Sequence, residues 1–279
     1  MKVLVTGAGG QVGTELLAAF PGHDVVGHDH GALDVGDRGA VHAAVAAAAP
    51  DAIVHAAAWT AVDACEADPD RALQINALGT RFVVEAARDV GARVLYLSTD
   101  YVFDGTKADP YDEWDTPSPR SVYGRSKRGG ELELGPEDTA VRTSWVCGRY
   151  GANMVGTILR LAAQPGPLRF VDDQWGHPTF ADDLAGMIAR LVTDQRQGLF
   201  HVTNQGAVTW FQFARAVLAA AGDDPGRVQP IATGDLDPPR PAPRPANSVL
   251  DNAALRLSGI PLLDHHEAPL QRLVDHLLA

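Results

Sequence analysis

Cysteine is scarce in this chain, and basic residues are outnumbered by acidic ones. The 279 residues include two cysteines, Cys65 and Cys147, which form neither a CxxC pair nor a zinc-like spacing. Two cysteines are too few for a disulfide framework, so the composition favours a reducing compartment. The chain has 23 lysines and arginines against 35 aspartates and glutamates, a net charge of −12. It therefore lacks the basic footprint that nucleic acids or an anionic membrane surface require.

Long apolar runs are also missing. No uninterrupted apolar segment reaches membrane-spanning length, and the first residues lead into a strand-like segment without a signal-peptide pattern. The hydrophobic fraction of 46% is ordinary for a globular protein. We therefore expect a cytoplasmic protein with an ordinary core and with neither nucleic-acid nor membrane partners.

A glycine-rich turn follows the first predicted strand, residues 2–6. Gly7, Gly10 and Gly13 are spaced as GxxGxxG, and residues 15–20 are typical of a helix. Between a strand and a helix, such glycines allow a tight turn, backbone approach to a pyrophosphate and close helix packing. A bare glycine pattern could be only a turn, but the strand and helix around it predict a dinucleotide site.

Predicted strands and helices alternate through the first half of the chain. The further predicted strands are residues 24–28, 51–55, 93–98 and 139–146, and the helices between them are residues 38–49, 70–90 and 123–134. This alternation predicts an α/β fold with a Rossmann-like, doubly wound parallel sheet. Beyond Gly151 the pattern loosens, with a proline-rich stretch at residues 238–245. We expect a dinucleotide-binding part over residues 1–150 and a mainly substrate-binding, smaller part over residues 151–279, and we leave open whether the two interleave.

Two aspartates follow the predicted strand at residues 24–28. Asp29 could accept hydrogen bonds from an adenosine ribose, and Asp34 is a second candidate, although both could simply cap turns. No lysine or arginine lies between Asp29 and Asp37, so no clamp for a 2′-phosphate is evident there. We expect NADH to be accepted, with NADPH left open and Arg38 as the residue that could reach its phosphate.

Tyr123 and Lys127 lie four residues apart, so on a helix they would project from one face. A positive charge beside a phenol favours the phenolate and brings tyrosine towards the working pH of a general acid. Thr99, which directly follows the strand predicted at residues 93–98, could hold the reacting oxygen. The alternative is a plain helix face with a lysine that reaches to solvent.

Together these motifs resemble the extended short-chain dehydrogenase/reductase family, and within it the dTDP-4-dehydrorhamnose reductases. The similarity covers essentially the whole chain. It rests on residues 7–13, 58–63, 98–105, 142–146 and 173–179.

The resemblance implies NADPH or NADH as cofactor and reduction of the C4 ketone of dTDP-4-dehydrorhamnose or a close dTDP-4-keto-6-deoxysugar. It makes Tyr123 the proton donor and puts Lys127 beside the nicotinamide ribose. It places Thr99, Asp100 and Trp145 on the sugar nucleotide. The implied cofactor contacts are Gly7, Gly10, Gln11, Val12, Gly13, Asp29, Asp34, Val35, Ala58, Trp59, Thr60, Tyr123 and Lys127.

Members of this family can bind Mg²⁺ at a dimer contact. Glu15 matches one acidic position of that kind, but no other ligand can be placed, so we assign no metal site and leave a homodimer open. His265, His266 and Glu267 lack further ligand spacing and are interpreted as the solvated start of a helix.

Two other functions compete with reduction. A sugar-nucleotide 4,6-dehydratase shares the glycine turn and the Tyr/Lys pair, but that group has a glutamate where this chain has Tyr101. A non-catalytic regulatory subunit could keep the fold, although it would not need Thr99, Tyr123 and Lys127 together. Trp145 also has two interpretations, as a core or hinge residue or as a wall for the sugar.

Overall fold

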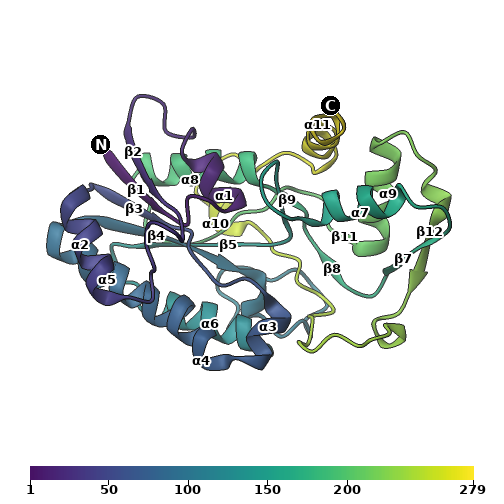
Figure 1. Ribbon diagram of the computed structural model, residues 1–279, viewed down its shortest axis with the longest axis horizontal. Helices are drawn as coiled ribbons and strands as arrows, with labels where there is room; N and C mark the ends of the chain where they lie inside the picture. Colours follow the sequence, from purple (N-terminus) through teal and green to yellow (C-terminus); the bar gives the residue numbers. More distant parts are fainter.

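Six parallel strands form the centre of the computed structural model, which describes residues 1–279 (Figure 1). They lie in the order β10-β5-β4-β3-β1-β2. Their bounds are β1 Lys2–Thr6, β2 Asp24–His28, β3 Ala52–His55, β4 Arg93–Thr99, β5 Thr139–Thr143 and β10 Gly198–His201. The chain order reverses between β1 and β3, which makes the carboxyl ends of these strands the expected ligand crevice. The Rossmann-like α/β fold predicted from the sequence is confirmed.

Helices cover both faces of the sheet, which explains why its strands are short continuous apolar runs. Val3, Leu4 and Val5 of β1 are all fully buried, as expected for parallel strands with no face in water. Helices α2 (Arg38–Ala48) and α5 (Gly79–Val90) pack on one face. Helices α1 (Gln11–Leu16) and α8 (Ala181–Thr193) pack on the other.

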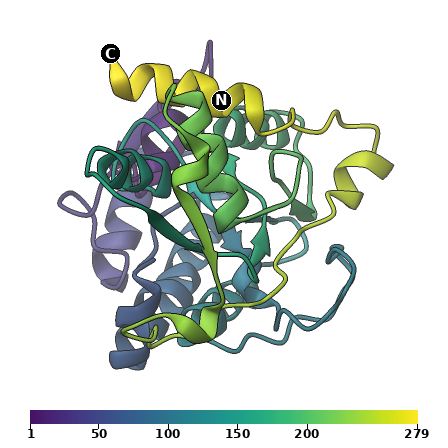
Figure 2. The same ribbon diagram turned by 90° about the vertical axis from the view of Figure 1, so that its right-hand side faces the viewer.

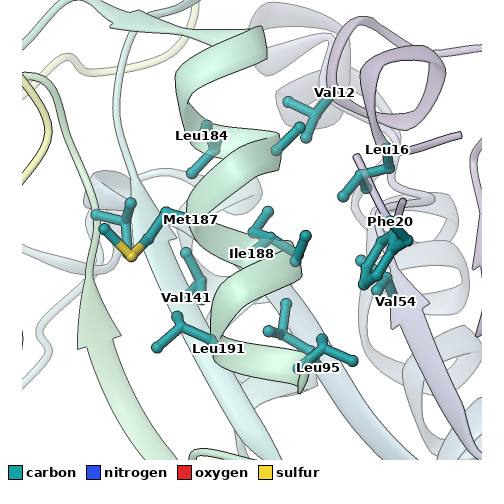
Figure 3. Packing of buried hydrophobic residues seen from close by; sticks show 14 of the residues in the cluster. Val12, Leu16, Phe20, Val54, Leu95, Val141, Leu184, Met187, Ile188 and Leu191 are labelled. Atoms are coloured by element: carbon teal, nitrogen blue, oxygen red, sulfur yellow. The ribbon is translucent and has the colours of Figure 1, made fainter. Parts of the chain in front are cut away.

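Helix α8 shows how the core is made. Leu184, Ile188 and Leu191 recur at helical spacing and are fully buried. In Figure 3 this stripe lies among side chains of α1, such as Leu16, and of the strands, such as Val141. Because α8 and β10 lie beyond residue 150 and belong to this layer, the sheet layer takes residues from both halves of the chain.

The smaller part has its own core at one end of the molecule, seen end-on in Figure 2. Its buried side chains include Ile158, Phe213, Val217 and Leu273. Its main elements are α7 (Met154–Ala162), β7 (Leu168–Val171), α9 (Trp210–Ala220), β12 (Val228–Ile231) and α11 (Glu267–Leu278). Helix α9 begins with a capping box in which Thr209 and Gln212 exchange hydrogen bonds with each other's backbone.

Short elements connect these layers and carry much of the site. They are α3 (Val62–Ala67), α4 (Pro69–Leu73), η1 (Gln74–Leu78), η2 (Asp100–Val102), α6 (Val122–Glu131), β6 (Val146–Cys147), β8 (Trp175–Gly176), β9 (Thr179–Phe180), β11 (Val208–Thr209), η3 (Pro225–Arg227), η4 (Thr233–Asp235) and α10 (Ala253–Leu257). None of the helices is both long and apolar enough to cross a membrane.

Two sequence-based expectations are wrong and one predicted helix is irregular, each for a local reason. The helix predicted over residues 70–90 contains a π-helical turn, η1, at which Asn76 bonds both the N–H and the C=O of Trp59. The strand predicted over residues 139–146 breaks at Trp145, which has φ +44°. His266 does precede a helix, but it is buried rather than solvated.

Candidate active site

Two adjoining cavities run along the carboxyl ends of the sheet strands. The first, of about 530 Å³, lies beside β2 and is lined by Asp29, Asp34, Val35 and Trp59. The second, of about 420 Å³, lies beside β4. The residues shared by both are Gly7, Gly10, Ala56 and Ala58. We call the two together the trough.

The second cavity gathers the residues that the sequence proposed for chemistry and substrate. It is lined by Thr99, Asp100, Tyr123, Lys127 and Trp145. It also holds the remaining cofactor candidates, Gln11, Val12, Gly13 and Thr60. Every site residue proposed from the sequence therefore lies on the trough, while the role of each remains a prediction.

The glycine turn is shaped by backbone contacts that leave no room for side chains. Gly7 has φ +73°, and a Cβ added to it would lie 2.6 Å from the Ala57 nitrogen. A Cβ on Gly13 would lie 2.0 Å from the Gly7 carbonyl oxygen. Strand β1, helix α1 and the β3 loop thus meet backbone to backbone, which is the cradle that a dinucleotide pyrophosphate requires.

The two aspartates after β2 combine both functions suggested by the sequence. Asp29 Oδ1 accepts from the Ala32 N–H at 2.9 Å, and Asp34 Oδ1 accepts from the Gly36 N–H at 2.9 Å. Each carboxylate therefore caps a turn, yet each also lines the first cavity. Arg38 is held by Glu85 at 2.9 Å and does not line this cavity.

Tyr123 and Lys127 come from α6, whose start is capped by Ser121. Both side chains are buried. Burial raises the pKa of Tyr123 and lowers the pKa of Lys127 to about 7, an effect that nearby Glu131 opposes. Lys127 Nζ donates to the Leu97 carbonyl at 2.7 Å. The lysine is therefore not the constant positive charge assumed from the sequence, because its lowered pKa leaves the amine only partly protonated near neutral pH.

Thr99 and Asp100 form a buried pair next to the phenol. Thr99 Oγ1 donates to Asp100 Oδ1 at 2.9 Å, and the Tyr101 ring meets the Tyr123 ring edge to face at 5.6 Å. Burial raises the pKa of Asp100 to about 6. Its Oδ2 atom has no hydrogen-bond partner, and the nearby Ser248 hydroxyl donates to the Trp175 carbonyl at 3.2 Å.

Trp145 is both packed and exposed to the second cavity. Its ring stacks on Trp210 with centroids 3.6 Å apart and 9° between the planes. It also lies against Gly176, where an added Cβ would be 2.5 Å from the indole. Trp210 lines the same cavity, although nothing in the sequence pattern singles it out, because it simply opens an amphipathic helix.

A third cavity, of about 380 Å³, joins the second through Tyr101 and Trp210. Three of its lining residues are Arg169, Arg240 and Arg244. Arg244 is fixed by Asp63 of α3, with Nη2 2.8 Å from Oδ2, and this contact holds the pKa of Asp63 below its usual value. We call this the arginine cavity. Sequence spacing does not reveal this cavity, because Arg169 lies on β7 and meets the proline-rich stretch that carries Arg240 and Arg244 only in the folded chain.

Comparison with known proteins agrees with this geometry. The family described as RmlD substrate binding domain matches residues 1–279. The chain belongs to this family. It is similar to a dTDP-4-dehydrorhamnose reductase from Streptomyces griseus, with 43% identity over 96% of this chain and 91% of the relative. It is also similar to a dTDP-4-keto-6-deoxy-D-glucose reductase from Streptomyces niveus, with 42% identity over 94% and 92%.

A solved structure of the same family carries a cofactor. The dTDP-4-dehydrorhamnose reductase of Bacillus anthracis, in complex with NADP, superposes with a TM-score of 0.93 at 37% identity and covers 98% of each chain. The family resemblance inferred from the sequence is thereby confirmed.

The magnesium hypothesis gains no support in this family member. Both oxygens of Glu15 are bonded by Arg149, at 2.9 and 2.6 Å. No cluster of three or more histidine, cysteine, aspartate or glutamate side chains is placed to hold a metal ion. The position matched to a metal ligand is thus neutralised by a guanidinium.

Proposed function

We propose that this chain reduces the C4 ketone of dTDP-4-dehydrorhamnose, or of a close dTDP-4-keto-6-deoxysugar, with NADPH or NADH. One observation carries the proposal: Thr99, Tyr123 and Lys127 surround one cavity that continues into the glycine turn on one side and the arginine cavity on the other. The names of the relatives from Streptomyces griseus and Streptomyces niveus support this substrate class.

The trough fits a dinucleotide in shape and chemistry. The backbone of the glycine turn would approach the pyrophosphate, and Asp29 keeps one carboxylate oxygen free of a backbone bond for the adenosine ribose. A nicotinamide bound beside Lys127 would supply the hydride for the ketone carbon. The complex of the Bacillus anthracis relative with NADP supports this assignment.

Tyr123 is the proposed proton donor. Its raised pKa keeps the phenol protonated until negative charge develops on the ketone oxygen. Thr99 would donate a second hydrogen bond to that oxygen and so stabilise the developing charge. Lys127 lies four residues further along α6 and places a protonatable amine in the buried surroundings of the phenol.

The sugar nucleotide fits the remaining walls. The stacked indoles of Trp145 and Trp210 offer an apolar face to a pyranose ring. The arginine cavity is lined by three arginines, of which Arg240 and Arg244 also contact Asp63, and guanidinium binds phosphate oxygens in a bidentate manner. A local cationic site is needed because the chain as a whole carries a charge of −12.

Dehydration of the sugar is disfavoured by Tyr101. This residue stands where a 4,6-dehydratase needs an acid, and burial raises the pKa of its phenol to about 12. A phenol stands here in place of the glutamate carboxylate that the dehydratases have at this position. Cytoplasmic action is also part of the proposal, because both cysteines are free thiols in the structure.

The deciding experiment follows the nicotinamide absorbance with a dTDP-4-keto-6-deoxysugar and each cofactor. We expect cofactor oxidation that depends on the sugar and is abolished by Tyr123→Phe. Tight binding of cofactor and sugar without turnover would instead identify a regulatory subunit.

A further inference from the structure

A single guanidinium faces the cavity at the adenosine end of the trough. Arg71 lies on the short helix α4. It is the one lysine or arginine that lines the first cavity, together with Asp29, Asp34 and Val35. Its side chain is exposed, and its Cζ lies 4.6 Å from the centroid of the Trp59 ring. Packing on an indole holds a guanidinium plane in place while leaving its N–H donors free.

The carboxylates of the chain leave this cation unpaired. Asp29 and Asp34 each receive a backbone N–H, and neither forms an ion pair with Arg71. The nearest arginine in sequence to these aspartates, Arg38, is bound to Glu85 outside the cavity. A positive group that lies on a cavity wall and has no carboxylate as ion-pair partner is suited to bind an anionic part of a ligand.

NADPH has two anionic parts, the pyrophosphate and the 2′-phosphate, and the location of Arg71 separates them. The pyrophosphate is expected at the glycine turn, and that turn borders both cavities. Arg71 lines the first cavity, with His30 and Val35, and does not line the second, which holds Gly13 and Tyr123. Its position matches the adenosine end, where NADPH carries a 2′-phosphate and NADH carries a hydroxyl.

We propose that Arg71 is the residue with which this chain recognises the 2′-phosphate of NADPH, and that Trp59 holds its guanidinium in place. The inference rests on the proposed function for its ligand. It moves the determinant of cofactor choice from the segment after β2, where no lysine or arginine lies between Asp29 and Asp37, to α4 after β3.

Binding titrations by calorimetry test this without any turnover. The ligands are NADPH, NADH, 2′,5′-ADP and 5′-ADP, and the proteins are wild type, Arg71→Ala and Arg71→Lys. Arg38→Ala is the matched control, because Arg38 is a neighbouring arginine that does not face the cavity. We expect Arg71→Ala to weaken NADPH and 2′,5′-ADP by about tenfold or more, as charge-assisted bonds of ~1.5 to 3 kcal/mol imply. NADH and 5′-ADP should change by less than about threefold, because neither carries a 2′-phosphate and exposed charge contacts contribute little.

The controls sharpen the result. Arg71→Lys should fall between wild type and Arg71→Ala, because it keeps charge but loses the planar fork. The advantage of NADPH over NADH in the wild type should shrink as salt is raised, and should not depend on salt in Arg71→Ala. Arg38→Ala should match the wild type, and melting temperatures should show that all variants are folded.

Three outcomes would overturn the inference. Equal weakening of NADH and NADPH by Arg71→Ala would assign Arg71 to the pyrophosphate. No weakening of either would leave it without a role in binding. A folded wild type that binds neither cofactor would overturn the proposed function together with this inference.

Discussion

The two ends of the site are built in opposite ways. The turn at the cofactor end is made of backbone: Gly7, Gly10 and Gly13 come from one continuous segment. The sugar end is made of side chains brought together from distant segments, such as Trp145, Trp210 and Arg244. Atoms added at Gly7 or Gly13 would therefore clash with backbone, whereas the sugar end depends on the side chains that are there.

Tyr123 lies where the two ends meet, so its loss should damage neither one. Tyr123→Phe removes only the transferable proton. We expect kcat to fall by ~10² to 10⁴, the usual contribution of a general acid. The dissociation constants of cofactor and sugar and the melting temperature should remain near those of the wild type. A variant with wild-type kcat would remove Tyr123 from the proposed chemistry.

Gly13→Ala should break the cofactor end alone. The added Cβ would lie 2.0 Å from the Gly7 carbonyl oxygen and 2.8 Å from Ala8 Cα, and both are backbone atoms. We expect a loss of ~1 to 3 kcal/mol in the free energy of unfolding, typical of overpacking, together with weaker NADPH binding. Gly186→Ala on α8, with nothing within 4 Å, is the matched control and should be at least as stable as the wild type, by up to ~1 kcal/mol, because alanine has the higher helix propensity. Normal cofactor affinity in Gly13→Ala would contradict the proposed role of the turn.

Gly176→Ala should affect only the sugar end. Its Cβ would meet the Trp145 ring at 2.5 Å and displace the indole from its stack on Trp210. We expect KM for the dTDP-sugar to rise about tenfold, equivalent to ~1.4 kcal/mol of lost binding, with unchanged NADPH affinity.

Trp145→Phe should likewise lower kcat/KM for the sugar while the melting temperature stays near that of the wild type. A large drop in melting temperature with unchanged kinetics would show that Trp145 serves packing instead.

Asp100→Asn tests the cost of a buried charge at the sugar end. Because the folded-state pKa is raised from an ordinary value near 3.8 to about 6, the native protein binds this proton more tightly than the unfolded chain does. Stability contributed by that proton is therefore present at low pH and is lost as the pH rises towards and through 6. The uncharged variant should gain about 1 to 3 kcal/mol over the wild type at pH 7.5, by 1.36 kcal/mol per unit. Urea unfolding near pH 4.5 should show most of this gain gone, and an equal gain at both pH values would refute the explanation.

This contrast between the ends also explains what could be predicted from sequence. The alternating strands and helices of the first half, the glycine turn and the Tyr123/Lys127 pair follow from local spacing, because the residues of each motif are neighbours in sequence. Arg71 and Trp210 could not be found in this way, since each lies on an ordinary helix and becomes part of the site only through tertiary packing. The pKa of Lys127 was also out of reach, because burial rather than sequence spacing determines it.

The bond between Asp63 and Arg244 joins residues 181 positions apart, and the neighbouring bond from the Ala242 N–H to Asp63 spans 179. Chains are made from the N-terminus at ~5 to 20 residues per second, and domains fold as they become complete. The last strand of the sheet, β10, ends at His201, well before these residues are made. During synthesis the sheet and the glycine turn can therefore be complete while the anchor of the arginine cavity has not yet left the ribosome.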